Sequence, residues 1–140
     1  MKSQYYLLDT HALIFWNLKQ GISQEFIQFL DYQDRLGNLF ISAISFGEIA
    51  LLIQRGKLAL TDIYAWKKEL FQNTNLQLIN PTVDKMIEAT RLPNHHKDPL
   101  DRLLIIQANY HHLLLVTKKF HHPKLCRSNF LDVRSVPVLH

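Results

Sequence analysis

Residues 113–117 read Leu113-Leu114-Leu115-Val116-Thr117, a nearly all-apolar run. Such a run is typical of a central strand whose two faces are both covered. Shorter runs with the composition of a strand lie at Gln4–Leu8, Leu39–Ser42 and Leu76–Ile79. Helical patterns separate these runs, and the alternation predicts an α/β fold in which helices cover both sides of a parallel sheet.

The helices are predicted from apolar residues that recur at i, i+3, i+4 and i+7. In the helix at residues 82–90, we expect Val83, Met86, Ile87 and Thr90 to point inward. The C-terminal segment is expected to be irregular until a short edge strand at Val133–Val138. The predicted helices are Ala12–Leu18, Gln24–Gln33, Ser45–Arg55, Thr61–Gln72, Thr82–Thr90 and Pro99–Tyr110.

Length and composition indicate a soluble globular protein with one domain over residues 1–140. Apolar residues make up 47% of the chain and charged residues 20%, which is ordinary for this class. The single cysteine, Cys126, excludes an internal disulfide framework and fits a reducing compartment. No apolar run approaches the roughly 20 residues that span a bilayer, so we expect a cytoplasmic protein without a membrane partner.

A formal net charge of +4 and a pI near 9.3 are compatible with a polyanionic partner. Basic residues gather late in the chain, and charge alone leaves open whether they bind phosphate or only face solvent. They are Lys118, Lys119, Lys124, Arg127 and Arg134.

Four carboxylates stand where a strand-like run gives way to a helix, or where a helix opens. They are Asp9 after Tyr-Tyr-Leu-Leu, Glu48 in Ser-Phe-Gly-Glu, and Asp98 with Asp101 in Asp-Pro-Leu-Asp-Arg. In an open α/β sheet, ligand sites gather at the carboxyl ends of the strands. Mg²⁺ takes oxygen ligands, commonly one or two carboxylates together with water and substrate phosphate. Convergence of these acids therefore predicts a metal-dependent phosphoryl-transfer site.

Helix capping explains the same acids without any function. Ser45 and Glu48 have the spacing of a capping box, and Asp98 and Asp101 flank a proline as N-cap and N3 acids would. Asp9 can also cap the helix that follows it. Each cap contributes about 1 kcal/mol, so capping stays open for every acid taken singly. If three acids converge, however, a divalent cation relieves their mutual repulsion.

Other chemistries lack their motifs. His11 stands two residues after Asp9, where a phosphoaspartyl enzyme of the haloacid dehalogenase type needs a second aspartate. The four glycines form no phosphate-binding loop or dinucleotide fingerprint, and no Gly-x-Ser-x-Gly elbow occurs. The histidines come mainly as adjacent pairs, whose side chains point apart and form no bidentate site. Among them, His95 or His96 is the best candidate for a secondary role near Asp98.

Together these motifs resemble the PIN-domain family, and more narrowly its VapC-type toxins of bacterial toxin–antitoxin pairs. Residues 6–16, which include Asp9, resemble the opening of that family, and residues 41–50 around Glu48 resemble its second motif. Residues 98–108 around Asp101 resemble the third motif, and residues 113–117 resemble the strand before the fourth. The resemblance runs in order over nearly the whole chain.

The resemblance implies a three-layer α/β/α PIN-like fold, with a central, mostly parallel sheet of four to five strands. It also implies a metal-dependent endoribonuclease, with Mg²⁺ or Mn²⁺ as the cofactor. The metal ligands and catalytic residues carry over to Asp9, Glu48 and Asp101. The auxiliary residues are Asp98, Thr10 and Thr117. The implied partners are an RNA substrate, a cognate antitoxin whose tail enters the acidic cleft, and a second copy in a homodimer.

One residue departs from the family pattern. Lys119 stands where the family generally has another aspartate, so we expect a one-ion site in which Lys119 is an auxiliary residue that contacts phosphate. Alternatively, residues 118–125 are rearranged and Asp132, or no acid at all, completes the site. The same departure keeps open a second class of function, a catalytically weakened binding module for antitoxin or RNA. A regulator phosphorylated on Asp9 is the third hypothesis.

The early helices are rich in aromatic residues. These residues either pack in an ordinary core or form a dimer face or antitoxin groove, since exposed aromatic patches tend to mark interfaces. They are Phe15, Trp16, Phe26, Phe29, Tyr64 and Trp66.

Overall fold

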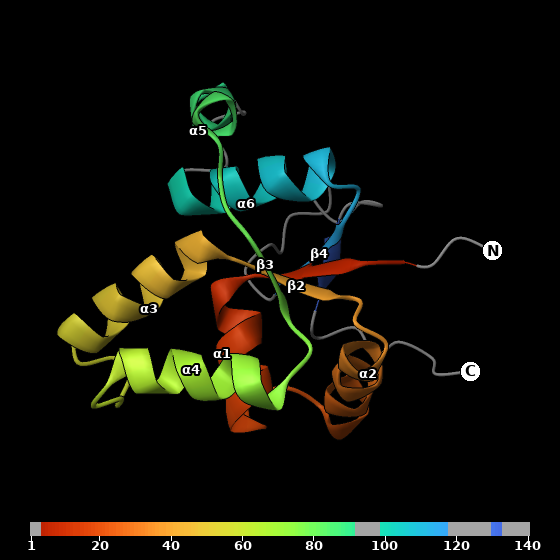
Figure 1. Ribbon diagram of the computed structural model, residues 1–140, viewed down its shortest axis with the longest axis vertical. Coiled ribbons are helices and arrows are strands. Elements are labelled where there is room, and N and C mark those ends of the chain that lie inside the picture. Colours follow the sequence, from red (N-terminus) through yellow and green to blue (C-terminus); the bar gives the residue numbers. More distant parts are fainter. Residues whose placement is uncertain (1–3, 92–98, 118–129, 133–140) are drawn as a thin grey trace.

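The computed structural model describes residues 4–91, 99–117 and 130–132, with only the backbone described at 99 and 130–132 (Figure 1). The described residues form a five-stranded sheet in the order β3-β2-β1-β4-β5, and every pairing in it is parallel. The strands are β1 (Tyr6–Leu8), β2 (Leu39–Ser42), β3 (Gln77–Ile79), β4 (Leu114–Thr117) and β5 (Phe130–Asp132). The predicted α/β fold with a parallel sheet is confirmed.

The helices of the described residues match the predicted helices, with ends that differ by no more than two residues. No helix in this part of the chain is long and apolar enough to cross a membrane. The helices are α1 (Thr10–Leu18), α2 (Gln24–Arg35), α3 (Ala43–Gln54), α4 (Ile63–Asn73), α5 (Val83–Ala89) and α6 (Pro99–Tyr110).

Helices cover the sheet on both faces, which makes the three layers that were predicted. Side chains alternate along a strand, so successive residues of β1 pack on opposite sides. Tyr6 and Leu8 join a core with α1, α2, α3 and α4, whereas Leu7 joins a smaller core with α6. Figure 1 shows α5 and α6 above the sheet and α1, α2 and α4 below it.

The parallel strands end side by side at one edge of the sheet. The last residue of β1 is in register with the penultimate residues of β2 and β4. The next position along each strand is therefore Asp9, Ser42 or Thr117, and these three residues form a row. α1 and α3 begin directly at this edge. α6 also begins there, because it returns the chain to the start of β4.

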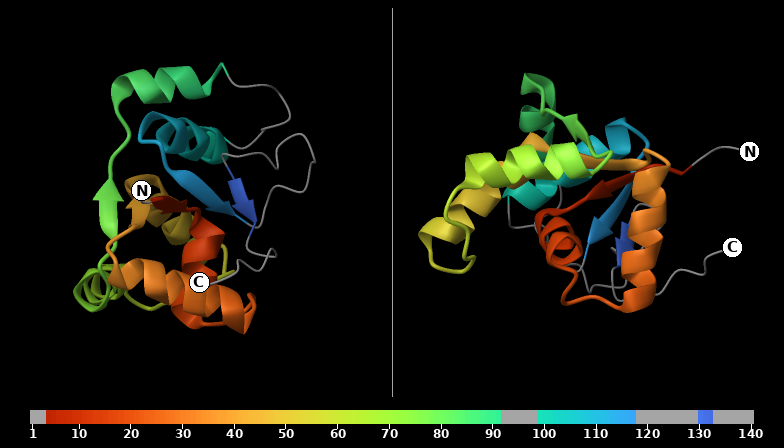
Figure 2. Two further views of the ribbon diagram at one scale, coloured as in Figure 1. Left: turned by 90° about the vertical axis from the view of Figure 1, so that its right-hand side faces the viewer. Right: turned by 60° about the horizontal axis from the view of Figure 1, so that its bottom comes forward.

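The predicted inward face of α5 is wrong. Val83, Met86 and Ile87 are 74%, 55% and 52% exposed, and Ala89 is the residue of this helix that is buried. The physical reason is that this short helix packs against α6 and not against the sheet, as the left view in Figure 2 shows. The apolar face of α5 is therefore a surface of the described structure.

The expectation of an irregular segment before residue 133 is also wrong. β5 begins at Phe130, and its apolar residues pair with Leu115 and Val116 of β4. The local sequence did not reveal that this apolar run pairs with the edge of β4. The predicted strand at Val133–Val138 lies outside the described residues.

Candidate active site

Asp9 stands between β1 and α1 and is 1% exposed. Its Oδ1 accepts a hydrogen bond from the backbone N–H of Ala12 at 2.7 Å, so Asp9 is the N-cap of α1. Its Oδ2 accepts a hydrogen bond from the hydroxyl of Thr117, at the end of β4, at 2.5 Å. The capping interpretation is confirmed for Asp9, but it explains only one of the two carboxylate oxygens.

Glu48 lies in the second turn of α3 and is 9% exposed. Ser42 is the N-cap of this helix, and its side chain accepts a hydrogen bond from a backbone N–H of the first turn at 3.2 Å. The predicted capping box of Ser45 and Glu48 is therefore wrong, because the cap lies three residues earlier. Instead, Oε1 of Glu48 accepts a hydrogen bond from the hydroxyl of Thr10 at 2.7 Å.

Ser45 is a residue of this cluster that sequence reasoning missed. It is 0% exposed, and its Oγ lies 3.0 Å from Oγ1 of Thr10. Thr10 is itself 1% exposed and contacts both Ser45 and Glu48 from the start of α1. The available signal was the three-residue spacing of Ser45 and Glu48, which places both on one face of a helix. The capping box explained that spacing locally and hid the tertiary contact.

Asp101 lies in the first turn of α6 and is 9% exposed. The fold thus places Asp101 at the same sheet edge as Asp9 and Glu48. Among the residues that the structure describes, no group of three or more His, Cys, Asp or Glu side chains could hold a metal ion. A three-acid metal centre therefore stays a prediction. The other predicted site residues, Asp98, Lys119, His95 and His96, lie outside the described residues.

β5 brings the backbone of one more acidic residue to this edge. Asp132 is the Cα partner of Thr117 in the register of β4 and β5. Its place in the row is compatible with the alternative in which Asp132 completes the site, and that alternative stays a prediction.

The donor atoms at this edge are oxygens, the type of ligand that a hard divalent cation takes. The buried acids offer carboxylate oxygens, and the residues hydrogen-bonded to them offer hydroxyl oxygens. Mg²⁺ prefers such oxygen donors and Mn²⁺ accepts them, whereas zinc and copper sites usually include imidazole or thiolate.

A comparison with protein-family models decides the family. The model of the PIN domain matches residues 6–124. This chain belongs to the PIN domain family. No match was found among the curated proteins.

Solved structures resemble this PIN domain in fold. A structure described as "Toxin-antitoxin complex from Klebsiella pneumoniae" is 20% identical with a TM-score of 0.62, covering 94% of this chain and 99% of that chain. "Structure of FitAB bound to IR36 DNA fragment" is 16% identical with a TM-score of 0.65, covering 96% and 99%. FitAcB from Neisseria gonorrhoeae is 19% identical with a TM-score of 0.53, covering 81% and 87%. At these identities the likeness shows the fold alone.

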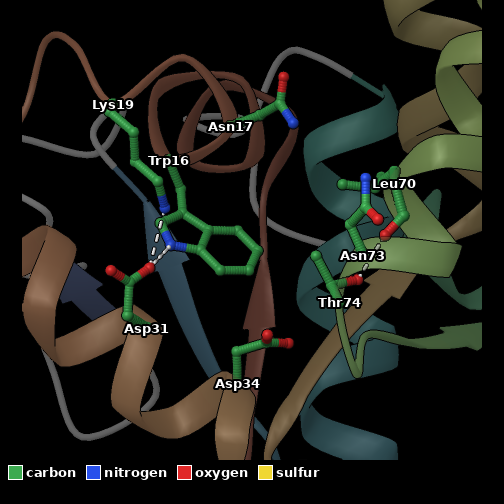
Figure 3. A pocket seen from close by; sticks show the side chains of 8 residues that line it. All are labelled: Trp16, Asn17, Lys19, Asp31, Asp34, Leu70, Asn73 and Thr74. Carbon is green, nitrogen blue, oxygen red and sulfur yellow. Dashed lines mark hydrogen bonds and ion pairs between the residues drawn. The ribbon is translucent and has the colours of Figure 1, made fainter.

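A polar pocket of about 240 Å³ lies at the C-terminal end of α1, away from the acidic cluster (Figure 3). The indole N–H of Trp16 and the ammonium of Lys19 both donate hydrogen bonds to Oδ1 of Asp31 at 2.8 Å. Burial alone would raise the pKa of Asp31, but the hydrogen bonds from Lys19 and Trp16 outweigh it and lower the pKa. Burial raises the pKa of Asp34, although Asp34 accepts a hydrogen bond from the backbone N–H of Asn75. The pocket is thus organised by internal polar pairs.

The aromatic residues of the early helices divide between the two interpretations. Tyr64 is 78% exposed, whereas Phe15 and Trp66 are half-buried. Ordinary core packing accounts for the buried ones, which are Trp16, Phe26 and Phe29.

Proposed function

We propose that this PIN domain is a Mg²⁺- or Mn²⁺-dependent endoribonuclease, the toxin of a toxin–antitoxin pair. The observation that carries the proposal is a pair of buried hydrogen bonds to Glu48 and Asp9 at the carboxyl edge of the sheet. Thr10 joins the start of α1 to Glu48, 38 residues further on, and Thr117 donates to Asp9 from another strand. Helix capping requires neither contact. Supporting hydrogen bonds of this kind are typical of acids that are oriented to hold a metal ion.

In the proposed mechanism, Asp9, Glu48 and Asp101 would hold the ion. When bound, a divalent ion lowers the pKa of its water, polarises the scissile phosphate and neutralises developing charge. The hydroxyls of Thr10 and Thr117 keep two of the carboxylates in fixed orientations. A carboxylate oxygen that accepts one hydrogen bond keeps a further lone pair for an ion, so these contacts are compatible with metal binding.

The net charge of the chain supports a polyanionic substrate such as RNA. Contacts of basic residues with the RNA backbone depend little on sequence. They weaken as the salt concentration rises, because the release of counterions from the RNA on binding then gains less free energy. The proposal gives Lys119 a contact with a phosphate oxygen. Cleavage and binding of single-stranded RNA are therefore expected to weaken steeply as the salt concentration rises.

The test is cleavage of a mixed-sequence single-stranded RNA in Mg²⁺ or Mn²⁺. We expect Asp9→Asn, Glu48→Gln and Asp101→Asn each to lose more activity than the roughly 10–100-fold that is typical of residues that only support a ligand. Asp84→Asn is the matched control, because Asp84 is an exposed acid on α5. If all three site variants cleave like Asp84→Asn, the site is wrongly assigned.

Titration with Mn²⁺ by calorimetry separates the nuclease from the weakened binding module. A nuclease is expected to bind Mn²⁺ at a site that Asp101→Asn weakens, whereas a binding module shows no tight site. If Asp132 supplies the fourth acid, Asp132→Asn also weakens Mn²⁺ binding. An Asp132→Asn variant with unchanged affinity would leave the one-ion site of three acids.

We also propose an antitoxin as the protein partner. Support comes from the similar structure that is described as a toxin–antitoxin complex, and from an apolar cavity of about 210 Å³ between α1 and the α3–α4 segment. Leu18 lines this cavity and is 49% exposed. Leu18→Asp is expected to prevent co-purification of the antitoxin while RNA cleavage continues. Retention of the antitoxin by this variant would exclude the cavity as the docking site.

A homodimer is the second proposed assembly, in which another copy covers the apolar face of α5. Met86 is 55% exposed and lines a cavity of about 280 Å³ with Leu100 and Leu103 of α6. Met86→Glu is expected to convert dimers to monomers in light scattering after size-exclusion chromatography. A monomeric native chain would contradict this assembly.

A further inference from the structure

Ser45 is buried in α3, although neither capping nor helix propensity explains it there. Its exposed fraction is 0%, and Ser42 caps the helix. Serine inside a helix is neutral to unfavourable, because its hydroxyl competes for backbone hydrogen bonds. The side-chain contact of Ser45 in the described structure is with Thr10, at 3.0 Å between the two hydroxyl oxygens. The role of Ser45 therefore depends on what Thr10 does.

Thr10 lies between two oxygen atoms but has a single hydroxyl proton. Its Oγ1 is 2.7 Å from Oε1 of Glu48 and 3.0 Å from Oγ of Ser45. An ionised carboxylate only accepts hydrogen bonds, and a hydroxyl binds it more strongly and at shorter distance than it binds another hydroxyl. Thr10 therefore donates to Glu48, and Ser45 donates to a lone pair of Thr10. The three side chains form a directed chain in which each bond strengthens the next.

We propose that Ser45 is a positioning residue for the divalent ion, because its hydroxyl bonds to Thr10, strengthens the hydrogen bond from Thr10 to Glu48 and so fixes the Glu48 carboxylate. This inference rests on the proposed function, which gives that carboxylate an ion to bind. Without Ser45, the hydrogen bond from Thr10 to Glu48 loses this cooperative support. The exposed fractions of Ser45, Thr10 and Glu48 are 0%, 1% and 9%, so little water is available to replace the missing donor.

Ser45→Ala tests the inference through the affinity of the full chain for Mn²⁺ alone, measured by titration calorimetry without RNA. We expect the affinity to fall by about tenfold, which is typical when a residue that supports a metal ligand is removed. The matched control is Ser42→Ala, which also removes a fully buried hydroxyl from the start of α3. Ser42→Ala is expected to lower the stability of the fold and to leave the Mn²⁺ affinity close to that of the wild type.

A double-mutant cycle separates positioning through Thr10 from simple packing. Thr10→Val keeps the shape of the side chain but removes the hydroxyl. If Ser45 acts only through Thr10, Ser45→Ala has no further effect on Mn²⁺ affinity in the Thr10→Val background. Should Ser45→Ala fail to fold, Ser45→Cys serves in its place, because the thiol is a much weaker donor of similar shape.

The outcomes distinguish this inference from the proposed function. If Asp101→Asn weakens Mn²⁺ binding while Ser45→Ala behaves like Ser42→Ala, the positioning role of Ser45 is wrong and the metal site stands. An undiminished effect of Ser45→Ala in the Thr10→Val background also overturns the role. A wild-type chain that binds no Mn²⁺ overturns both the positioning role and the nuclease proposal.

Discussion

The two faces of the sheet are built differently. Among the residues whose side chains the structure describes, helices α1 to α4 cover one face with a cluster of fifteen buried apolar residues, whereas α6 covers the other with a cluster of six. On the first face, Thr10 and Trp16 have hydrogen-bond partners, but on the second, the buried amide of Gln107 has none within the described structure. The candidate site thus takes Asp9 and Glu48 from the densely packed face and Asp101 from the thinner one.

Two buried leucines, one on each face, are expected to give the largest change in the free energy of unfolding. They test directly whether the two faces differ in packing. Leu13 on α1 is 0% exposed and Leu104 on α6 is 1% exposed. Each substitution by alanine is expected to lower the free energy of unfolding by about 2–5 kcal/mol, with Leu13→Ala at the upper end. The reason is that a cavity beneath α6 can collapse more easily, because fewer of the described elements hold its walls. Urea unfolding measures both values.

Equal losses for the two leucine variants would show that the faces are equally rigid. A larger loss for Leu104→Ala would reverse the comparison. Tyr64→Ala serves as the control for truncation itself, since Tyr64 is 78% exposed and its loss should cost little.

The start of α3 shows why local pattern predicted the fold better than the site. Ser42 and Ser45 are both good N-cap residues, and Glu48 three residues after the second made a capping box the better local solution. In the structure the N-cap is Ser42. The side chains of Ser45 and Glu48 instead contact Thr10, which lies 35 and 38 residues earlier in the chain. A contact over that distance is not encoded in any local spacing.

Helix α5 shows the same limit from the other side. Apolar periodicity correctly predicted a helix there, but it could not tell a face buried on the sheet from a face left for a partner. Val83 is 74% exposed, although its place in the apolar periodicity is that of a core residue. By contrast, the central strands were predictable, because a nearly all-apolar run such as residues 114–117 is typical of a strand that is covered on both faces.

Substitution of Gln107 is expected to change the free energy of unfolding by less, and it tests the packing of the α6 face. This residue of α6 is 0% exposed, and neither amide atom has a hydrogen-bond partner in the described part of the chain. An unsatisfied buried amide costs about 1–3 kcal/mol, so Gln107→Met, which keeps the volume, is expected to raise the free energy of unfolding by about 1 kcal/mol. Gln107→Glu should lower it instead, since a buried charge replaces the amide. Destabilisation by Gln107→Met would mean that the amide is satisfied, for example by buried water.

Two glycines on the densely packed side give effects of the same size or smaller. Gly47 lies inside α3, and a Cβ built there meets nothing within 4 Å. Gly47→Ala is therefore expected to raise the free energy of unfolding by about 0.5–1 kcal/mol, the usual difference in helix propensity. Gly21→Ala should destabilise, because its φ is +81° and a Cβ would lie 2.9 Å from the ring of Phe15. Thermal denaturation measures both, and a loss with Gly47→Ala would contradict the open space beside Glu48.

The smallest predicted effect concerns Asp31 and Asp34, one turn apart on α2. The pKa of Asp31 is lowered in the fold, so its stabilising contribution is complete well above its ordinary pKa of about 4 and is lost as the pH falls through the lower folded value. Asn at position 31 can still accept the hydrogen bond from Trp16 but does not titrate. Asp31→Asn is therefore expected to reduce the fall in the free energy of unfolding between pH 7 and pH 3. The difference should stay under about 1 kcal/mol, because the pair with Lys19 is partly exposed.

Asp34 should respond with the opposite sign. Its pKa is raised by burial, so protonation as the pH falls through the raised value relieves a cost that the charged form carries at neutral pH. Asp34→Asn should therefore remove a contribution that raises the free energy of unfolding as the pH falls. Asp31→Asn removes a contribution that lowers it. Unfolding in urea at several pH values between 7 and 3 measures both variants against the wild type. If both variants shift the pH dependence of the free energy of unfolding in the same direction, the hydrogen bonds of Asp31 and Asp34 do not control that dependence. The polar pairs on the densely packed face would then contribute less to stability than their short distances indicate.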